Sequence, residues 1–268
     1  FPERRAAGLV MSTGRSENLS KPVALVTGAS YGVGAAAALS LAREGFDLAI
    51  SATRLSNLDA TAKALQATGC RITTVELDLC SQSSIEAAIA YVLGACGRLD
   101  VLVNNAAVNL RKAALDVTPE EWDAVLRANT TGTFFITQAF ARQRIKAGQP
   151  GCVVNVSSTH GIVGAAERST YGVSKGAVLQ MTRMLAIEWA PHGIRVNAVA
   201  PGRLDTASPS RAAKSGDAKY MQAMLDRIPL HRLATAEDVA EAVAYLAGPR
   251  GGFVTGHTIV IDGGLTAY

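Results

Sequence analysis

Aromatic and charged residues are both scarce in this chain, and their scarcity narrows the functions that it can have. Aromatic residues make up 5% and charged residues 18% of the 268 residues. The lysines and arginines are scattered, without runs and without interleaved aromatic residues, so the pattern does not favour nucleic-acid binding. The formal net charge of +4 is mild and still leaves room for a basic pocket that takes a phosphate group. We expect no nucleic-acid partner.

Cysteine and histidine are also few, with four of each. The cysteines (Cys70, Cys80, Cys96 and Cys152) form no CxxC pair, and no histidine stands at metal-ligand spacing from them. We expect buried free thiols in a reducing compartment and no bound metal.

Long apolar runs and linker-like segments are missing as well. No apolar stretch approaches the length of a membrane span, and residues 1–20 lack the apolar centre of a signal peptide. We expect a soluble, cytoplasmic protein with no membrane partner and a disordered tail over residues 1–20. No segment rich in proline, glycine and serine divides the rest, so residues 21–268 are predicted to form one domain.

Hydrophobic residues are abundant, at 49% of the chain, which is ample for a sheet buried on both faces. Apolar segments predict strands at residues 22–27, 47–51, 71–77, 99–104, 152–158, 194–199 and 258–262. Helical patterns alternate with them, the longest at residues 119–146 and 169–190. This alternation predicts an α/β fold: a Rossmann-type doubly wound parallel sheet of about seven strands with helices on both faces.

A glycine-rich turn joins the first predicted strand to an alanine-rich helix. Gly28 permits a tight turn, Gly32 lets the backbone approach a pyrophosphate, and Gly34 allows the helix to pack closely on the strand. Glycines that serve turn geometry alone are the alternative. The order of strand, turn and helix favours a nucleotide-binding loop.

Acid–base chemistry is suggested by Tyr171 and Lys175, which lie four residues apart on one face of a predicted helix. An ammonium group beside a phenol favours the phenolate and eases proton transfer to or from a carbonyl or alcohol. Such a pair alone is usually a surface contact. However, Ser158 ends a predicted buried strand thirteen residues earlier, where its hydroxyl can reach the same substrate oxygen.

With these motifs in order, residues 22–264 resemble the short-chain dehydrogenase/reductase family. The resemblance is carried by residues 27–34 (Thr-Gly-x-x-x-Gly-x-Gly), 104–107 (Asn-Asn-Ala-Ala), 201–206 (Pro-Gly-x-x-x-Thr), 255–257 and 262–264. Ala107 departs from the family pattern, which has glycine there. We expect the added methyl group to be tolerated, because the preceding residues make the backbone contact.

The resemblance implies a catalytic tetrad of Asn129, Ser158, Tyr171 and Lys175. Tyr171 would be the general acid in carbonyl reduction and the base in the reverse direction. Lys175 would bind the nicotinamide ribose and favour the phenolate, while Ser158 polarises the carbonyl. Asn129 would kink its helix and hold a water that links Lys175 to solvent; a satisfied amide in a helix is the alternative.

The resemblance also implies which residues bind the cofactor. The set comprises Gly28, Ser30, Tyr31, Gly32, Val33, Gly34, Thr53, Arg54, Asp78, Leu79, Asn105, Ala106, Tyr171, Lys175, Pro201, Gly202, Leu204 and Thr206. Asp78 would accept from the adenine amino group, although an acid there is often a helix cap. Residues near 203–228 would form a substrate lid.

The end of the second strand indicates the cofactor. NAD-selective folds usually place a carboxylate there, whereas by family register this chain has Ala52, followed by Thr53 and Arg54. Both side chains can donate to a 2′-phosphate, and the contact from Arg54 would be charge-assisted. Tyr31 stands where many NADP-dependent members have a basic residue. On balance the sequence predicts NADP rather than NAD.

We therefore expect an oxidoreductase that moves a hydride between a nicotinamide cofactor and a carbonyl or secondary alcohol, as an NADPH-dependent ketoreductase similar to 3-oxoacyl-carrier-protein reductases. The alternatives are an alcohol, sugar or steroid dehydrogenase that works oxidatively and a dinucleotide-binding sensor without turnover. His160 contacts substrate or is a hydrogen-bonded loop histidine, and Arg168 and Arg203 bind an anionic substrate or are solvated. Apolar long helices predict a homo-oligomer, with a homotetramer expected from the resemblance.

Overall fold

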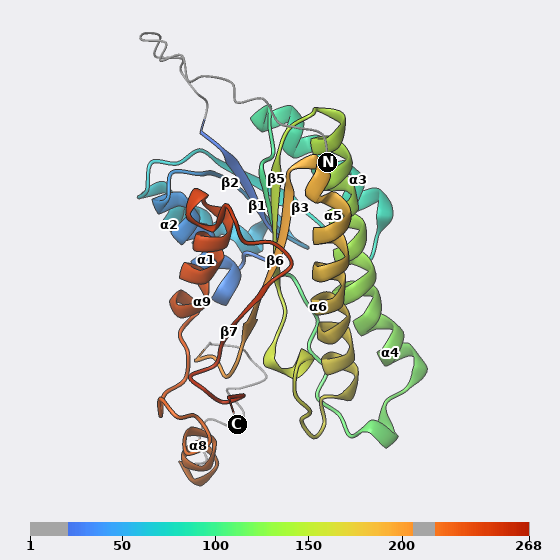
Figure 1. Cartoon of the computed structure of the whole chain (residues 1–268), viewed down its shortest axis with the longest axis vertical. Coiled ribbons are helices and arrows are strands. Elements are labelled where there is room, and N and C mark those ends of the chain that lie inside the picture. Colours follow the sequence, from blue (N-terminus) through green and yellow to red (C-terminus); the bar gives the residue numbers. More distant parts are fainter. Residues whose placement is uncertain (1–20, 206–217, 268) are drawn as a thin grey trace, which may run out of the picture.

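The protein is built around a seven-stranded parallel sheet, as a computed structural model of the chain shows for residues 21–205 and 218–267 (Figure 1). The sheet order is β3-β2-β1-β4-β5-β6-β7. The strands are β1 (Val23–Val26), β2 (Asp47–Ala52), β3 (Ile72–Glu76), β4 (Val101–Asn104), β5 (Gly151–Val156), β6 (Ile194–Pro201) and β7 (Thr258–Ile261). The predicted doubly wound fold is confirmed.

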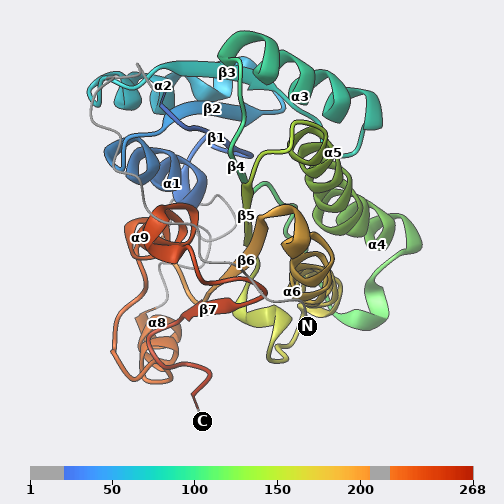
Figure 2. The same cartoon turned by 45° about the horizontal axis from the view of Figure 1, so that its top comes forward.

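Helices cover both faces of the sheet, as Figure 2 shows. On one face lie α1 (Gly32–Arg43), α2 (Asp59–Gln66) and α9 (Ala236–Ala247), and on the other lie α3 (Gln82–Cys96), α5 (Thr133–Lys146) and α6 (Ser169–Trp189). The other α-helices among the described residues are α4 (Pro119–Leu126) and α8 (Ala218–Leu225). Each face has its own cluster of buried apolar side chains, so burial of apolar area holds both layers on the sheet.

The strands β1 and β4 are neighbours in the sheet although they are not consecutive in the sequence. The chain leaves β1 toward one edge of the sheet, through β2 and β3, and then returns to β4 on the other side of β1. At such a reversal the loops after the two strands diverge and leave a crevice at their carboxyl ends, where ligands bind in open α/β sheets. The fold therefore places the candidate site after β1, β4 and β5.

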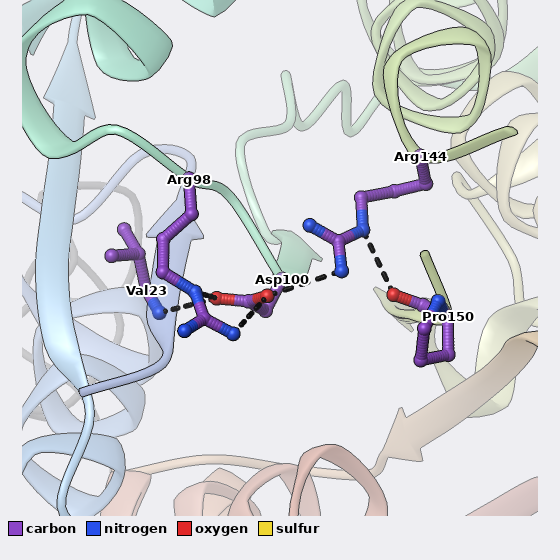
Figure 3. A network of polar contacts seen from close by, with 5 residues as sticks. All are labelled: Val23, Arg98, Asp100, Arg144 and Pro150. Atoms are coloured by element: carbon purple, nitrogen blue, oxygen red, sulfur yellow. Dashed lines mark hydrogen bonds and ion pairs between the residues drawn. The ribbon is translucent and has the colours of Figure 1, made fainter. Parts of the chain in front are cut away.

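At the amino ends of the central strands, Asp100, which precedes β4, joins several elements (Figure 3). Its carboxylate accepts from the Val23 amide at 2.8 Å and from Arg98 Nε at 2.7 Å, and it pairs with Arg144 Nη2 at 3.2 Å. Arg144 Nε donates to the Pro150 carbonyl at 2.8 Å. This network fastens β1, β4, α5 and the start of β5 to one another, far from the carboxyl ends of the strands.

Several expectations need correction. The helix expected over residues 119–146 is divided into α4, a π-helical segment η3 (Arg127–Gly132) and α5. The break contains Asn129, where the resemblance implied a kink, and the Asn129 side chain bonds to Val108 outside the helix. The fifth strand ends at Val156 rather than at Ser158. Of the four cysteines only Cys152 is buried, and Cys80 is exposed because it follows the β3 loop rather than facing the core. Across residues 21–205 and 218–267, no helix is both long and apolar enough to span a membrane.

Candidate active site

The glycine turn after β1 fits tightly against the loop after β4. Gly28 has φ 64°, and a Cβ atom there would lie 2.8 Å from Ala106 Cα. A Cβ atom on Gly34 would lie 2.5 Å from Asn105 Nδ2. Only glycine meets both the left-handed conformation at residue 28 and the close approach at residue 34. The two loops therefore meet at the crevice between β1 and β4.

Side chains of Thr27 and Asn105 hold this turn in place. Thr27 Oγ1 accepts from the amides of Asn105 and Ala106, each at 3.0 Å. Asn105 Nδ2 donates to the carbonyls of Thr27 at 3.0 Å and Gly28 at 2.8 Å. Because these bonds satisfy the backbone of the turn internally, its shape is set before any ligand binds.

The N-terminus of α1, like those of α2, α5 and α6, has no side-chain cap. Tyr31 occupies its N-cap position without a side-chain hydrogen bond, and no acidic residue lies in the first turn. By contrast, Ser81, Thr118 and Thr235 cap α3, α4 and α9. First-turn N–H groups carry partial positive charge, so the amides of Gly32 and the residues after it suit an anion such as a pyrophosphate. This end of the site therefore fits a dinucleotide.

The end of β2 offers donors and no carboxylate. Ala52 is the last residue of the strand, and Thr53 and Arg54 after it are exposed. Within the described part of the chain, Arg54 forms no ion pair. Ser51 Oγ is buried here, and the described residues give it no hydrogen-bond partner.

The end of β3 agrees only in part with the expected cofactor contacts. Asp78 is exposed, and its Oδ1 accepts from the Cys80 amide at 2.8 Å in the loop before α3. The helix-cap role that was the alternative for Asp78 is filled by Ser81. The Leu79 side chain is buried in the apolar cluster beside α3 and α5. Any contact of Leu79 with a cofactor would therefore use its backbone.

Tyr171 and Lys175 lie together in the first two turns of α6. The Lys175 side chain is buried, with 4% exposure for the residue, and Nζ donates to the Val156 carbonyl at 2.7 Å. Nζ lies 5.9 Å from the centroid of the Tyr171 ring. Burial lowers the pKa of Lys175 to about 8, because desolvation disfavours the ammonium form. The lysine is still mainly charged at neutral pH.

Ser158 follows β5 and is the N-cap of the turn at Thr159–Gly161. Its Oγ accepts from the His160 amide at 3.2 Å, so the serine's own proton can be donated elsewhere. The His160 ring meets the Tyr171 ring edge-on, with centroids 6.3 Å apart. His160 therefore lies within the site, next to the candidate acid.

Asn129 is buried in the π-helical segment and binds a loop rather than its own helix. Its Oδ1 accepts from the Val108 amide at 2.7 Å, and its Nδ2 donates to the Val108 carbonyl at 2.8 Å and to Ser174 Oγ at 3.0 Å. Ser174 Oγ in turn donates to the Tyr171 carbonyl at 2.7 Å. Because both polar atoms of the Asn129 side chain are engaged, a water bound here would accept no hydrogen bond from that side chain and would use the main-chain carbonyls of the π-helical segment. Segments of this kind are frequent at functional sites.

The end of β6 supplies the remaining described residues of the candidate set. Pro201 ends the strand, and a Cβ atom on Gly202 would lie 2.7 Å from Asp262 Cβ, so the loop packs on the start of the C-terminal turn. Leu204 forms a bridge to Ala234. Thr206 and much of the expected lid lie outside the described residues.

Sequence reasoning missed two residues that support the site. Ser157 Oγ donates to the Lys175 carbonyl at 2.9 Å, and Ser174 links Asn129 to Tyr171. The only feature of the sequence that could have indicated Ser157 is that it forms a pair of serines with Ser158. Arg168, considered for an anionic substrate, donates through Nη1 to Asn109 Oδ1 at 2.6 Å.

Known proteins are similar to this chain over most of its length. A family model described as Enoyl-(Acyl carrier protein) reductase matches residues 28–266. The 2-dehydro-3-deoxy-D-gluconate 5-dehydrogenase of Dickeya dadantii is 35% identical over 250 residues, which cover 93% of this chain and 97% of that protein. The 3-oxoacyl-[acyl-carrier-protein] reductase FabG of Thermotoga maritima is 36% identical, covering 92% and 98%. A crystal structure from Agrobacterium tumefaciens, of a putative 2-deoxy-d-gluconate 3-dehydrogenase with bound NADP, superposes with a TM-score of 0.85 at 34% identity, covering 93% and 98%.

Proposed function

The chain belongs to the short-chain dehydrogenase/reductase family of oxidoreductases, and from this premise we propose that it is an NADPH-dependent ketoreductase. One observation carries the proposal. The buried Lys175 ammonium lies 5.9 Å from the centroid of the Tyr171 ring and donates to the Val156 carbonyl at the end of β5, two residues before Ser158 and beside the crevice at which β1 and β4 end.

When bound, a nicotinamide dinucleotide supplies the hydride that this chemistry requires. The glycine turn at residues 28–34 and the open N-terminus of α1 would hold its pyrophosphate. Asn105 and Ala106 border that turn, and Lys175 would donate to the nicotinamide ribose. Pro201, Gly202 and Leu204 would line the nicotinamide end, together with Thr206.

The protein's own task is to manage a proton. Tyr171 would donate its phenolic proton to the oxygen of a ketone, and the Lys175 charge would stabilise the phenolate that remains. Ser158 would donate to the same oxygen, because its bond with the His160 amide is one in which Oγ accepts and leaves the hydroxyl proton available. In the reverse direction Tyr171 would act as the base toward an alcohol.

NADP is proposed over NAD because of the end of β2. Ala52 provides no carboxylate to accept from the ribose hydroxyls or to repel a 2′-phosphate. Thr53 and Arg54 are exposed and can both donate to a phosphate. The Agrobacterium tumefaciens relative with bound NADP supports the same choice.

An oxidative dehydrogenase is the second candidate, and it is favoured by the name of the Dickeya dadantii relative. A panel of ketones with NADPH or NADH, and of alcohols and sugar acids with NADP or NAD, separates the two by absorbance of the reduced cofactor. The proposal expects faster turnover of ketones and a higher kcat/KM with NADPH than with NADH. Turnover only in the oxidative direction would favour the second candidate, and cofactor binding without any turnover would contradict both.

A further inference from the structure

Two loops that flank Tyr171 are tied to each other. One loop follows β4 (residues 105–113), and the other precedes α6 (residues 162–168). Arg111 Nε pairs with Glu167 Oε2 at 2.5 Å, and the Lys112 amide donates to the Glu167 carbonyl at 3.1 Å. Arg168 Nη1 donates to Asn109 Oδ1 at 2.6 Å. We call these three contacts, made by Asn109, Arg111, Lys112, Glu167 and Arg168, the clasp.

The backbone of Glu167 is unusual. Its φ of 63° lies in the left-handed region, which is unfavourable for a residue with a Cβ atom. Such a conformation persists only where the surroundings impose it, and here both the carboxylate and the carbonyl of Glu167 are engaged by the other loop. Exposed ion pairs add little to stability, so stability alone does not account for the strained residue. Strained residues of this kind are concentrated at functional sites.

The clasp extends a set of contacts that already holds the tyrosine from the other side. Asn129 fixes Val108 through both backbone atoms and also donates to Ser174, which donates to the Tyr171 carbonyl. Val108 precedes Asn109, the partner of Arg168. Tyr171 therefore lies between two residues of α6 that are connected to the loop after β4. Arg168, at the N-cap of α6, bonds to Asn109, and Ser174, three residues after the tyrosine, is linked to Val108 through Asn129.

We propose that Glu167 and Arg168 are positioning residues that set where the Tyr171 hydroxyl lies over the substrate, by locking the first turn of α6 to the loop after β4. This inference rests on the proposed function, in which Tyr171 moves the proton. A displacement of about 1 Å at a reacting group can lower a rate by about 100-fold. The clasp is made mostly by side chains on an otherwise exposed rim, so it can be broken without opening the core.

The test replaces Glu167 by Asn, because asparagine tolerates a positive φ but cannot form the ion pair. E167N should lower kcat about 10- to 100-fold, while the Kd for NADPH and the melting temperature stay near those of the wild type.

The matched control is Glu44→Asn, which breaks another exposed Arg–Glu pair, with Arg250 at 2.6 Å, far from the site. The double variant Arg111→Glu with Glu167→Arg should regain much of the lost kcat. Wild-type kcat in E167N, or an equal loss in E44N, would overturn the proposal.

Hydrogen exchange gives a readout that needs no turnover. In E167N the amides of residues 107–113 and 162–172 should exchange faster than in the wild type, and in E44N they should not. Unchanged exchange in E167N would contradict the clasp even if activity fell. A wild-type protein that turns over no substrate contradicts the proposed function instead, and the exchange comparison then still shows whether the clasp holds the tyrosine helix.

Discussion

At Tyr171 the proposed chemistry depends on one hydroxyl group. Tyr171→Phe removes the proton donor and keeps the ring that meets His160 edge-on. We expect kcat to fall by about 10²- to 10⁴-fold, the usual contribution of general acid catalysis. Cofactor affinity and melting temperature should stay close to wild type, because no packing is lost. Steady-state kinetics and a cofactor titration check this, and wild-type turnover in the variant would show that the acid lies elsewhere.

Lys175 links catalysis to pH. Burial lowers its pKa from the usual 10.5 to about 8, so between these values the unfolded chain binds a proton that the folded protein does not. The contribution of Lys175 to the stability of the apo wild type should therefore be least favourable below about pH 8 and should rise as the pH increases toward 10.5. Lys175→Met should remove this rise, and it should also weaken cofactor binding and slow turnover. Denaturant unfolding from pH 7 to 10 measures the effect; the same rise in the variant would assign it to another group.

Arg54 is the residue on which the cofactor choice depends most directly. It is exposed at the end of β2 and lies two residues past Ala52. A charge-assisted contact to a 2′-phosphate would be absent with NADH, so Arg54→Ala should weaken NADPH binding more than NADH binding. Titration of the variant with each cofactor measures the two losses. Equal losses would remove Arg54 from the phosphate site.

Among the elements, the turn η4 (Thr159–Gly161) packs closely against the helix α6, and Gly161 permits this contact because it has no side chain. A Cβ atom on Gly161 would lie 2.8 Å from the Lys175 carbonyl carbon and 2.9 Å from the Gly176 amide nitrogen. Because these neighbours are backbone atoms, Gly161→Ala should push η4 away from α6 and separate Ser158 from Lys175. Overpacking of this kind costs about 1–3 kcal/mol of stability, and we expect a larger loss in kcat than the change in melting temperature implies.

Gly164→Ala is the control for that change, since nothing lies within 4 Å of a Cβ atom at residue 164 in the same loop. Its kcat and melting temperature should match the wild type. If Gly161→Ala were equally harmless, the close approach of η4 and α6 would not matter for the site.

At the scale of the whole molecule, apolar side chains on the outer surface of α5 and α6 are left exposed by the residues that the structure describes. Ile187 is 79% and Met184 60% exposed, and Phe135 on α5 is partly exposed. We propose that a second copy of the chain covers them, within a homo-oligomer that we expect to be a tetramer. Light scattering at micromolar concentration should give a mass above that of the monomer. Ile187→Glu should lower that mass, and Tyr91→Lys, at an exposed position on α3, should not; a monomeric wild type contradicts the proposal.

The sequence by itself determined the class of fold and the candidate chemistry. The periodicity that predicts strands and helices is a property of contiguous residues. The requirement for glycine at residue 28 is also local, because it follows from the positive φ at that residue. The four-residue spacing of Tyr171 and Lys175 needs only a helix to bring the two side chains together. These features could be predicted because each depends on local backbone geometry.

Only the tertiary structure decided how the site is held. The lowered pKa of Lys175 comes from burial against the end of β5, and the Asn129 side chain bonds to Val108, 21 residues away. Arg168 donates to Asn109, which lies 59 residues away in the chain, so no local pattern indicated that Arg168 was engaged. Contacts of this kind follow from how distant segments meet when the apolar faces are buried, and no local pattern records them.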